Sequence, residues 1–225
     1  MRISVVVIAK NEEKCIENCL KSLRAQTLKP EIIVVDGHST DRTVPIARKY
    51  ADKVVKDNKK GISDARNVGF KTAKGDVVAY CDADCLPRED WTKSIMEIIG
   101  GNLAVSGPLM AYDGSTKLKI SFKIWTDMMP RFLSLLGCNF LWGANMAFRK
   151  SILMTVPFRT KFLEDYDIRC RLRKIGSIKF SKKMTMSAST RRFKASFYRN
   201  CLKYYFMNIL KIRLGFQPGD GYYNC

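Results

Sequence analysis

The chain has 225 residues, of which 46% are hydrophobic and 27% charged, and this composition excludes a disordered or fibrous protein. The length is sufficient for one sizeable core. Because 40 Lys and Arg outnumber 21 Asp and Glu, the formal net charge is +19, which indicates an anionic partner: nucleic acid, a lipid surface or a phosphorylated substrate.

Two patterns alternate through the first hundred residues. Short apolar runs predict buried strands at 3–9, 32–35, 53–56 and 76–80. Amphipathic stretches predict helices at 15–26, 39–50, 62–73 and 87–99, the last of them starting at Pro87. This order predicts an α/β protein with a Rossmann-like, mostly parallel sheet, right-handed crossovers and helices on both faces.

The pattern is less regular beyond residue 100. Strands are expected at 103–110, 142–149 and 178–188. Helices are expected at 117–136, with a break near Pro130, and at 164–174 and 194–214. No signal peptide or membrane span is expected, and the eight Cys predict reduced, mostly buried thiols in a cytosolic protein.

Polar side chains follow three of the predicted strands, in the segments 10–12, 36–39 and 82–84. Ligands of such sheets bind at the carboxyl ends of the strands. Asp82 and Asp84, one residue apart, can share a divalent cation or divide between a metal and a ribose hydroxyl, and their hard oxygen atoms suit Mg²⁺ or Mn²⁺. Asp36 can accept hydrogen bonds from a nucleobase or ribose, or serve as an ordinary turn residue.

A second acidic group lies at the start of the predicted helix 164–174. Glu164, Asp165 and Asp167 are three of only six acidic residues in the back half of the chain. A carboxylate among so many cations is a candidate general base. The alternative is that these charges only complement the helix dipole. Because His38 is the only His, a His-based triad or a His-rich zinc site is not predicted.

These pieces together resemble the family 2 glycosyltransferases, which have the GT-A nucleotide-diphospho-sugar fold. The resemblance covers about residues 1–185, and its motifs occur in the order and spacing of the family. The matching stretches are Ser4-Val-Val-Val-Ile-Ala-Lys-Asn-Glu-Glu, Ile32-Ile-Val-Val-Asp-Gly-His-Ser-Thr-Asp-Arg-Thr, Ala65-Arg-Asn-Val-Gly, Asp82-Ala-Asp, Gly143-Ala-Asn-Met-Ala-Phe-Arg and Glu164-Asp-Tyr-Asp.

The resemblance implies a role for each matching residue on the donor side. Asp36 would recognise the base, and Asp82 would lie near the ribose and beside Asp84, which would bind Mg²⁺ or Mn²⁺. Asp64 and Arg66 would lie near the diphosphate. The residues that would line the nucleotide are Ala9, Asn11 and Glu12.

The remaining matches would surround the acceptor. The segment under the donor sugar and the acceptor would be Gly143, Ala144 and Asn145. Asp165 would be the general base, with Glu164 beside it. One base and one displacement would invert the anomeric centre without a covalent sugar–enzyme step. The metal, with Arg66 or a cation of the back half, would stabilise the leaving nucleoside diphosphate.

The family's processive members carry a Q-x-x-R-W motif, whereas the comparable region here reads Ser189-Thr-Arg-Arg-Phe. This departure argues against a processive polymer synthase. It leaves Arg191 or Arg192 as a further candidate to contact the diphosphate. The expected organisation is a GT-A catalytic domain at 1–190. Its nucleotide-binding half would span about 1–110 and its acceptor half about 111–190.

The excess positive charge lies in the back half. Residues 1–110 hold 18 basic and 15 acidic residues, whereas residues 111–225 hold 22 and 6. The segment 191–225 is expected to be a basic, aromatic, amphipathic helical tail. Such a helix suits the surface of an anionic membrane, although its apolar side can instead pack on the catalytic domain. A peripheral location on the cytosolic face, and a polyprenyl-phosphate or lipid-linked acceptor, would follow from membrane binding.

Two other classes of function share some of these features. The basic back half could bind nucleic acid, with aromatic residues stacking on bases. The acidic strand ends would repel phosphates without a metal, so nucleic acid is not the expected partner. A metal-dependent nucleotidyltransferase would use the same two carboxylates but release pyrophosphate instead of a nucleoside diphosphate.

Overall fold

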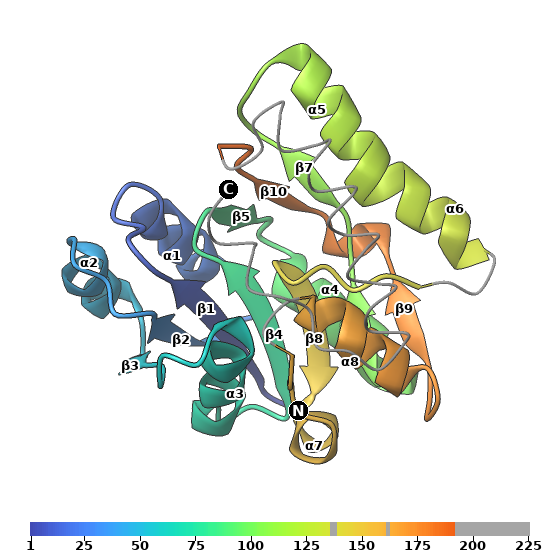
Figure 1. Cartoon of the computed structure of the whole chain (residues 1–225), viewed down its shortest axis with the longest axis horizontal. Coiled ribbons are helices and arrows are strands. Elements are labelled where there is room, and N and C mark those ends of the chain that lie inside the picture. Colours follow the sequence, from blue (N-terminus) through green and yellow to red (C-terminus); the bar gives the residue numbers. More distant parts are fainter. Residues whose placement is uncertain (136–138, 161–162, 192–225) are drawn as a thin grey trace.

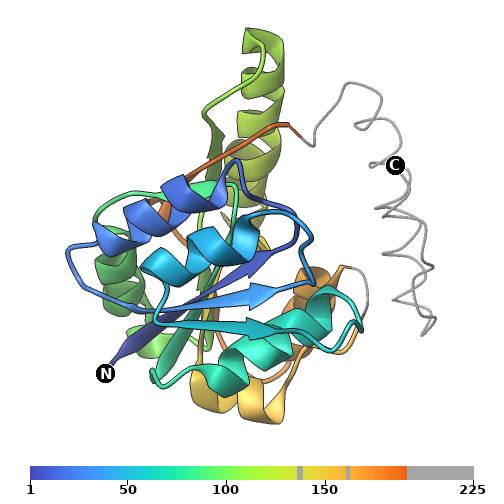
Figure 2. The same ribbon diagram turned by 90° about the vertical axis from the view of Figure 1, so that its left-hand side faces the viewer.

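The computed structural model describes residues 1–135, 139–160 and 163–191. A seven-stranded sheet forms the centre of the domain, with helices on both of its faces (Figure 1, Figure 2). In sheet order the strands are β3 (Lys53–Lys56), β2 (Glu31–Asp36), β1 (Ile3–Ala9), β4 (Val77–Asp82), β8 (Asn145–Arg149), β6 (Ala104–Ser106) and β9 (Ile178–Phe180). The predicted α/β architecture with its mostly parallel sheet is thus confirmed.

One strand, β8, runs against the others. The strands β3, β2, β1 and β4 are parallel, whereas β8 pairs antiparallel with β4 and β6. In this register Asn145, the first residue of β8, lies opposite Cys81 near the end of β4. The loop that precedes β8 is therefore brought to the edge where the parallel strands end.

The two faces of the sheet bury separate cores. One is covered by α1 (Ile16–Arg24), α2 (Thr43–Tyr50) and α4 (Trp91–Ile98), and the other by α3 (Ile62–Thr72), α7 (Lys150–Thr155) and α8 (Glu164–Leu172). Alternation along β1 sends Val5 and Val7 to the first core and Val6 to the second. The helix α3 approaches so closely at Gly69 that a Cβ there would collide with Val6.

A three-stranded sheet stands beside the main one. It consists of β5 (Cys85–Pro87), β10 (Met186–Ala188) and β7 (Leu109–Ala111), with β10 antiparallel to β5 and parallel to β7. The predicted start of a helix at Pro87 is wrong, because Pro87 ends β5 and the helix begins at Trp91.

The predicted single strands at 103–110 and 178–188 are each divided between the two sheets. The strands β6 and β7 are separated at Gly107 and Pro108, and β9 and β10 by the 3-10 turn Lys182–Met184. A Cβ on Gly107 would meet Met184, so the chain can cross there only without a side chain. Alternating hydrophobicity identified extended chain here but not the change of sheet.

A long helix, the 116–135 helix, lies against β7 and extends beyond the rest of the domain (Figure 2). It consists of α5 (Thr116–Lys123), a π turn (Ile124–Met128) and α6 (Met129–Leu135). The predicted break at Pro130 does not occur. Because proline has no N–H to donate, the carbonyl of Thr126 is available, and it accepts a hydrogen bond from Trp142 Nε1 at 3.1 Å.

The predicted helix at 194–214 and most of the tail at 191–225 lie outside the described residues. Within the residues that the structure describes, none of the helices combines the length and the apolar character needed to cross a bilayer. The remaining short element is the 3-10 turn Ile99–Gly101, after α4.

Candidate active site

The predicted strand-end segments meet at one edge of the main sheet. Ala9 is paired with Asp36, and Ile8 is paired with Asp82. Asn145 completes the row, since it lies opposite the residue before Asp82. The loops that follow β1, β2 and β4 are therefore neighbours, as the order of strands and helices predicted, and the antiparallel β8 adds the loop that precedes it.

The loops after β1 and β2 are held together by backbone and side-chain hydrogen bonds. Asp36 is almost fully buried, and both of its carboxylate oxygens accept the N–H of Ser39 at 3.2 Å. The carbonyl of Ala9 accepts the N–H of Gly37 at 2.8 Å. Asn11 has a φ of 54°, and its side-chain oxygen accepts the N–H of Thr40 at 2.9 Å. These hydrogen bonds hold the loops after β1 and β2 in a fixed conformation relative to each other.

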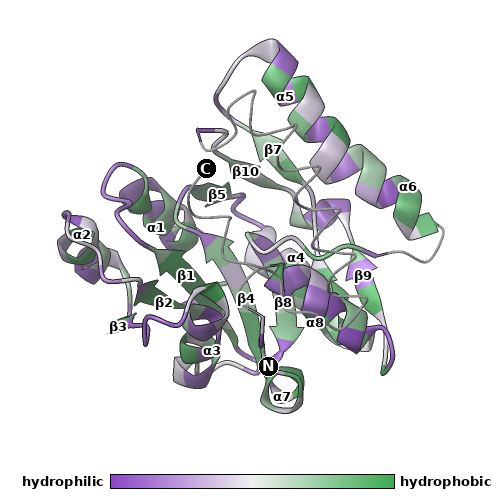
Figure 3. Cartoon of the chain, viewed as in Figure 1, coloured by the Kyte–Doolittle hydropathy of each residue, from purple (hydrophilic) through white to green (hydrophobic). Residues whose placement is uncertain are grey.

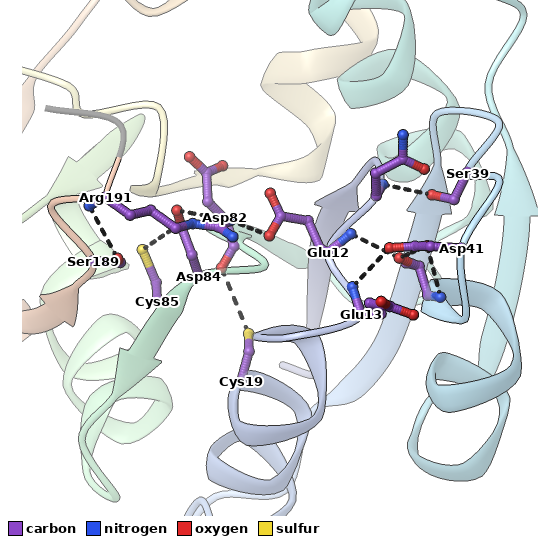
Figure 4. Close-up of polar contacts among 12 residues, drawn as sticks. Glu12, Glu13, Cys19, Ser39, Asp41, Asp82, Asp84, Cys85, Ser189 and Arg191 are labelled. Carbon is purple, nitrogen blue, oxygen red and sulfur yellow. Dashed lines mark hydrogen bonds and ion pairs between the residues drawn. The ribbon is translucent and has the colours of Figure 1, made fainter. Parts of the chain in front are cut away.

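An arginine from the end of the second sheet reaches the acidic edge (Figure 4). Arg191 forms an ion pair with the buried Glu12, and its Nη2 atom lies 3.5 Å from Oδ2 of Asp84. The backbone N–H of Glu12 donates to Thr43 Oγ1 at 2.7 Å, which fixes the backbone that carries this carboxylate. The sequence identified Arg191 as one of two candidate cations after β10, and the other, Arg192, lies outside the described residues.

Asp113 holds the segment that carries Arg191. The hydroxyl of Ser189 and the N–H of Thr190 donate to Asp113 at 2.5 and 2.6 Å, and the N–H of Arg191 donates to Ser189 Oγ at 3.2 Å. Sequence reasoning missed Asp113, because a single acid between β7 and the 116–135 helix carries no motif.

The carboxylates of Asp82 and Asp84 fit a hard divalent cation in their chemistry. Asp82 ends β4, Asp84 lies in the turn before β5, and both are half-buried. Among the residues described, no group of three or more His, Cys, Asp or Glu side chains is arranged to hold a metal on its own. Mg²⁺ in proteins is usually bound by one or two carboxylates together with substrate phosphates.

Arg66 lies beneath the loop before β8. Its Nε and Nη2 atoms are each 3.0 Å from Glu164 Oε1, and its Nη1 atom donates to the carbonyl of Gly143 at 3.0 Å. Only 1% of Arg66 is exposed, and its guanidinium carbon lies 5.2 Å from the ring centroid of Tyr80 and 5.8 Å from that of Phe158. The resemblance implied a place near the diphosphate, whereas in the structure Arg66 contacts protein and supports the loop from below.

Asp165 lies beside that loop at the start of α8. Its carboxylate accepts the N–H of Gly143 at 3.2 Å and the N–H of Tyr166 at 2.7 Å. Part of the residue remains exposed, yet burial among protein atoms raises the pKa of its carboxyl to about 7. The negative charge of Glu164 contributes to this increase, and the charge of Arg66 and the two N–H donors oppose it.

The three residues of the loop motif have different surroundings. Asn145 is fully buried, and its amide bonds only to protein: the indole of Trp91 and the carbonyls of Gly107, Pro108 and Met184. Ala144 is half-buried against the core, and a Cβ on Gly143 would meet the guanidinium of Arg66. Asn145 thus joins the two sheets, while Gly143 and Ala144 lie closer to the surface.

Asp64 lies in the first turn of α3, the helix that follows the edge strand β3. Its carboxylate accepts the N–H and the side-chain amide of Asn58 at 2.7 and 2.9 Å, which fixes the loop between β3 and α3. His38 bonds through Nε2 to the carbonyl of Asp57 at 3.0 Å. Both residues therefore shape the loops that follow β2 and β3.

The fold and the row of strand-end carboxylates define a GT-A protein. A solved structure with this fold is the mannosyltransferase PcManGT from Pyrobaculum calidifontis in complex with GDP-Man and Mn²⁺. The two chains superpose with a TM-score of 0.70 at 21% identity, over 88% of this chain and 59% of that one. The family model described as "Glycosyl transferase family 2" matches residues 4–156, and the chain belongs to this family.

Curated relatives are longer than this chain. A glycosyltransferase, AglE, of Haloferax volcanii is 28% identical over 144 residues, which are 54% of this chain and 47% of the relative. A Methanococcus voltae enzyme, named a dolichyl N-acetyl-alpha-D-glucosaminyl phosphate 3-beta-D-2,3-diacetamido-2,3-dideoxy-beta-D-glucuronosyltransferase, is 26% identical over 74% of this chain and 55% of its own length. The chain thus spans about half the length of these two relatives.

Proposed function

We propose that the chain is an inverting glycosyltransferase that moves a sugar from a UDP- or GDP-linked donor to an acceptor hydroxyl or phosphate. The main support is the placement of Asp165. A carboxyl whose pKa is raised to about 7 borders the Gly143 loop, and that loop lies on the same sheet edge as the carboxylates of Asp82 and Asp84.

The donor would bind along the row of strand ends. In this proposal Asp36 and the loop of Ala9, Asn11 and Glu12 recognise the nucleoside, with Asp64 behind them. Asp82 and Asp84 would hold Mg²⁺ or Mn²⁺, which when bound neutralises charge on the diphosphate as the anomeric bond breaks. Arg191 would turn from the carboxylates toward the diphosphate and add a second positive charge there.

The acceptor would bind above Gly143 and Ala144. Asp165 would take the proton from its hydroxyl as the oxygen attacks the anomeric carbon from the face opposite the leaving group. Glu164 would act as a positioning residue, because its carboxylate is paired with the buried Arg66, which in turn holds the carbonyl of Gly143. Asn145 would keep the loop in place and not contact the sugar.

A lipid-linked acceptor is the preferred class. The name of the Methanococcus voltae relative describes transfer to a dolichyl-phosphate-linked sugar, and this supports the proposal by similarity. Attachment to the cytosolic face of an anionic membrane would bring this chain to such an acceptor. Nucleic acid bound here would place its phosphates against the carboxylates of the sheet edge. Repulsion between these like charges disfavours such binding.

A thermal-shift assay with UDP- and GDP-sugars, with and without Mn²⁺, tests the donor site. A ligand that binds only the folded state raises its stability by RT ln(1 + [L]/Kd). Wild-type protein should show a shift that depends on both Mn²⁺ and the donor, and Asp84→Ala should lose the metal-dependent part. Asp90→Ala, at an exposed site near the start of α4, is the matched control.

Three results would contradict the proposed function. If Asp84→Ala shows the same Mn²⁺-dependent thermal shift as the wild type, the assignment of Asp84 as a metal ligand is contradicted. Release of pyrophosphate, and not of a nucleoside diphosphate, would favour the nucleotidyltransferase. Binding of nucleic acid that weakens steeply with salt, without any effect of sugar nucleotides, would favour the nucleic-acid-binding protein.

The pH dependence of transfer should follow the ionisation of Asp165. Because the base must be deprotonated, kcat/KM is expected to rise with pH and level off above about 7.

The contribution of Asp165 to the free energy of unfolding should decrease as the pH rises. A carboxyl whose pKa is raised from 3.8 to about 7 in the folded state binds its proton more tightly there, so its stabilising effect is fully present below about pH 4 and is lost as the pH rises to about 7.

Donor binding measured over the same pH range is the control for this profile. It should stay constant while kcat/KM rises. A transfer rate that is already maximal well below neutral pH would contradict the assignment of Asp165 as the base.

A further inference from the structure

The 116–135 helix presents an apolar ridge to solvent. Five large side chains on one side of this helix are between 49% and 84% exposed: Ile120, Ile124, Met128, Phe132 and Leu135. Figure 3 shows hydrophobic and hydrophilic residues interleaved along the helix. A contiguous exposed apolar patch of this kind marks an interaction site more often than single exposed residues do.

The π turn keeps this ridge straight. The first four ridge residues are spaced by four, and in a regular α-helix four residues turn through about 400°, so the row would wind around the helix. The wider turn at Ile124–Met128 reduces that drift. The buried residues Phe122, Thr126 and Pro130 have the same spacing and face the domain. One helix thus has a fixed inner face and an apolar outer face.

The ridge has a basic rim. The exposed side chains of the helix include four cations: Lys117, Lys119, Lys123 and Arg131. The acidic residue of the helix, Asp127, is turned inward and buried, 3.7 Å from Arg131. An amphipathic helix with a basic border and Ile, Met, Phe and Leu at its centre fits the headgroup region of an anionic membrane.

Charge also argues against a second copy of the chain as the partner. Two copies joined through this ridge would bring their rims of Lys and Arg together, on molecules that each carry +19. An anionic lipid surface matches both the apolar centre and the cations.

The helix is fastened to the candidate active site at two points. Thr126 accepts the indole N–H of Trp142, which directly precedes Gly143. At the other end, Asp113, three residues before the helix, holds the Ser189–Arg191 segment. A surface that binds the ridge would therefore be connected, through the body of the helix, to the Gly143 loop and to the segment that carries Arg191.

We propose that the apolar ridge of the 116–135 helix docks the protein onto anionic membranes, with its hydrophobic side chains in the interfacial layer and its cations against the lipid headgroups. The expected membrane contact was the tail at 191–225, and the ridge provides a contact within the folded domain. This inference does not depend on glycosyl transfer, because its readout is binding to lipid.

Sedimentation of the full chain with vesicles tests the ridge. The wild type should bind vesicles of phosphatidylcholine and phosphatidylglycerol and not those of phosphatidylcholine alone. The double variant Ile124→Asp/Phe132→Asp should partition about 100-fold less, since burial of each side chain contributes about tenfold. The control Met154→Asp/Ile175→Asp, which changes two exposed apolar residues elsewhere on the domain, should bind as the wild type does.

A second variant reports insertion directly. Because the wild type has three Trp of its own, the signal of Phe132→Trp is read as its difference from the wild type, and this difference should shift to shorter wavelength on anionic vesicles and be quenched by brominated lipid chains. Circular dichroism should show that all variants remain folded, because the changed side chains are exposed.

The proposal is overturned if the wild type does not sediment with anionic vesicles, or if the ridge variant sediments as strongly as the wild type. The second result would assign membrane binding to another part of the chain. Light scattering that shows a wild-type dimer dissociated by the ridge variant would overturn it as well, since the ridge would then join two copies. A Phe132→Trp signal unchanged by vesicles would contradict insertion.

Discussion

Replacing Asp165 by Asn is expected to abolish most of the sugar transfer while leaving donor binding intact. General base catalysis contributes about 100- to 10,000-fold, and the amide of Asn cannot accept the proton. The substitution keeps the size of the side chain and an oxygen that can accept the N–H of Tyr166. Transfer rates should be measured with saturating donor and Mn²⁺, and binding by the thermal shift described above.

Two comparisons make this experiment decisive. Asp90→Asn, a change of the same chemistry on an exposed residue, should leave the rate unchanged. A variant with Asn at 165 that transfers at the wild-type rate would show that another group accepts the proton. A variant that loses its donor shift would instead show that Asp165 contributes to binding.

Removal of the Arg66 guanidinium should have the largest effect on stability. Arg66→Met leaves Glu164 without its partner inside the protein, and breaking a buried ion pair in this way costs about 3–5 kcal/mol. For a domain of this size that corresponds to a decrease in Tm of roughly 6–20 °C. The free energy of unfolding should be measured by urea titration and Tm by calorimetry.

The double variant Arg66→Met/Glu164→Gln separates charge from packing. It removes both charges and should recover part of the stability lost by the single variant. Arg42→Met is the matched control, because Arg42 pairs with Glu13 at 3.3 Å with 82% of its side chain exposed. That change should cost less than about 1 kcal/mol. Equal stability of Arg66→Met and the wild type would contradict the importance of the buried pair.

The front half of the fold could be predicted because its signals are local. Continuous apolar runs at 3–9, 32–35 and 76–80 mark buried strands, and their order with the helices implies a parallel sheet. The ends of such strands must meet at one edge, so the neighbourhood of Asp36 and Asp82 followed from topology. No knowledge of side-chain contacts was needed.

The back half depends on contacts between residues far apart in the sequence. The sequence around Arg66 does not predict its ion pair with a glutamate 98 positions later. The amphipathic pattern of its helix does not predict its burial either. The same holds for Asn145, whose amide joins carbonyls of two other segments. At Pro130 a local rule predicted a break, but the π turn and the indole of Trp142 accommodate the proline.

The reversed direction of β8 places the start of this strand, and not its end, at the edge where β1, β2 and β4 end. The residues just before β8 are tied to the 116–135 helix by the bond from the Trp142 indole to the Thr126 carbonyl, so a change in that helix would be transmitted to the Gly143 loop. The buried amide of Asn145 marks the point where this loop joins the sheet. Exchange of residues 116–144 as one unit, with Asn145–Arg149 retained, is therefore a rational route to chimeric proteins with an altered Gly143 loop.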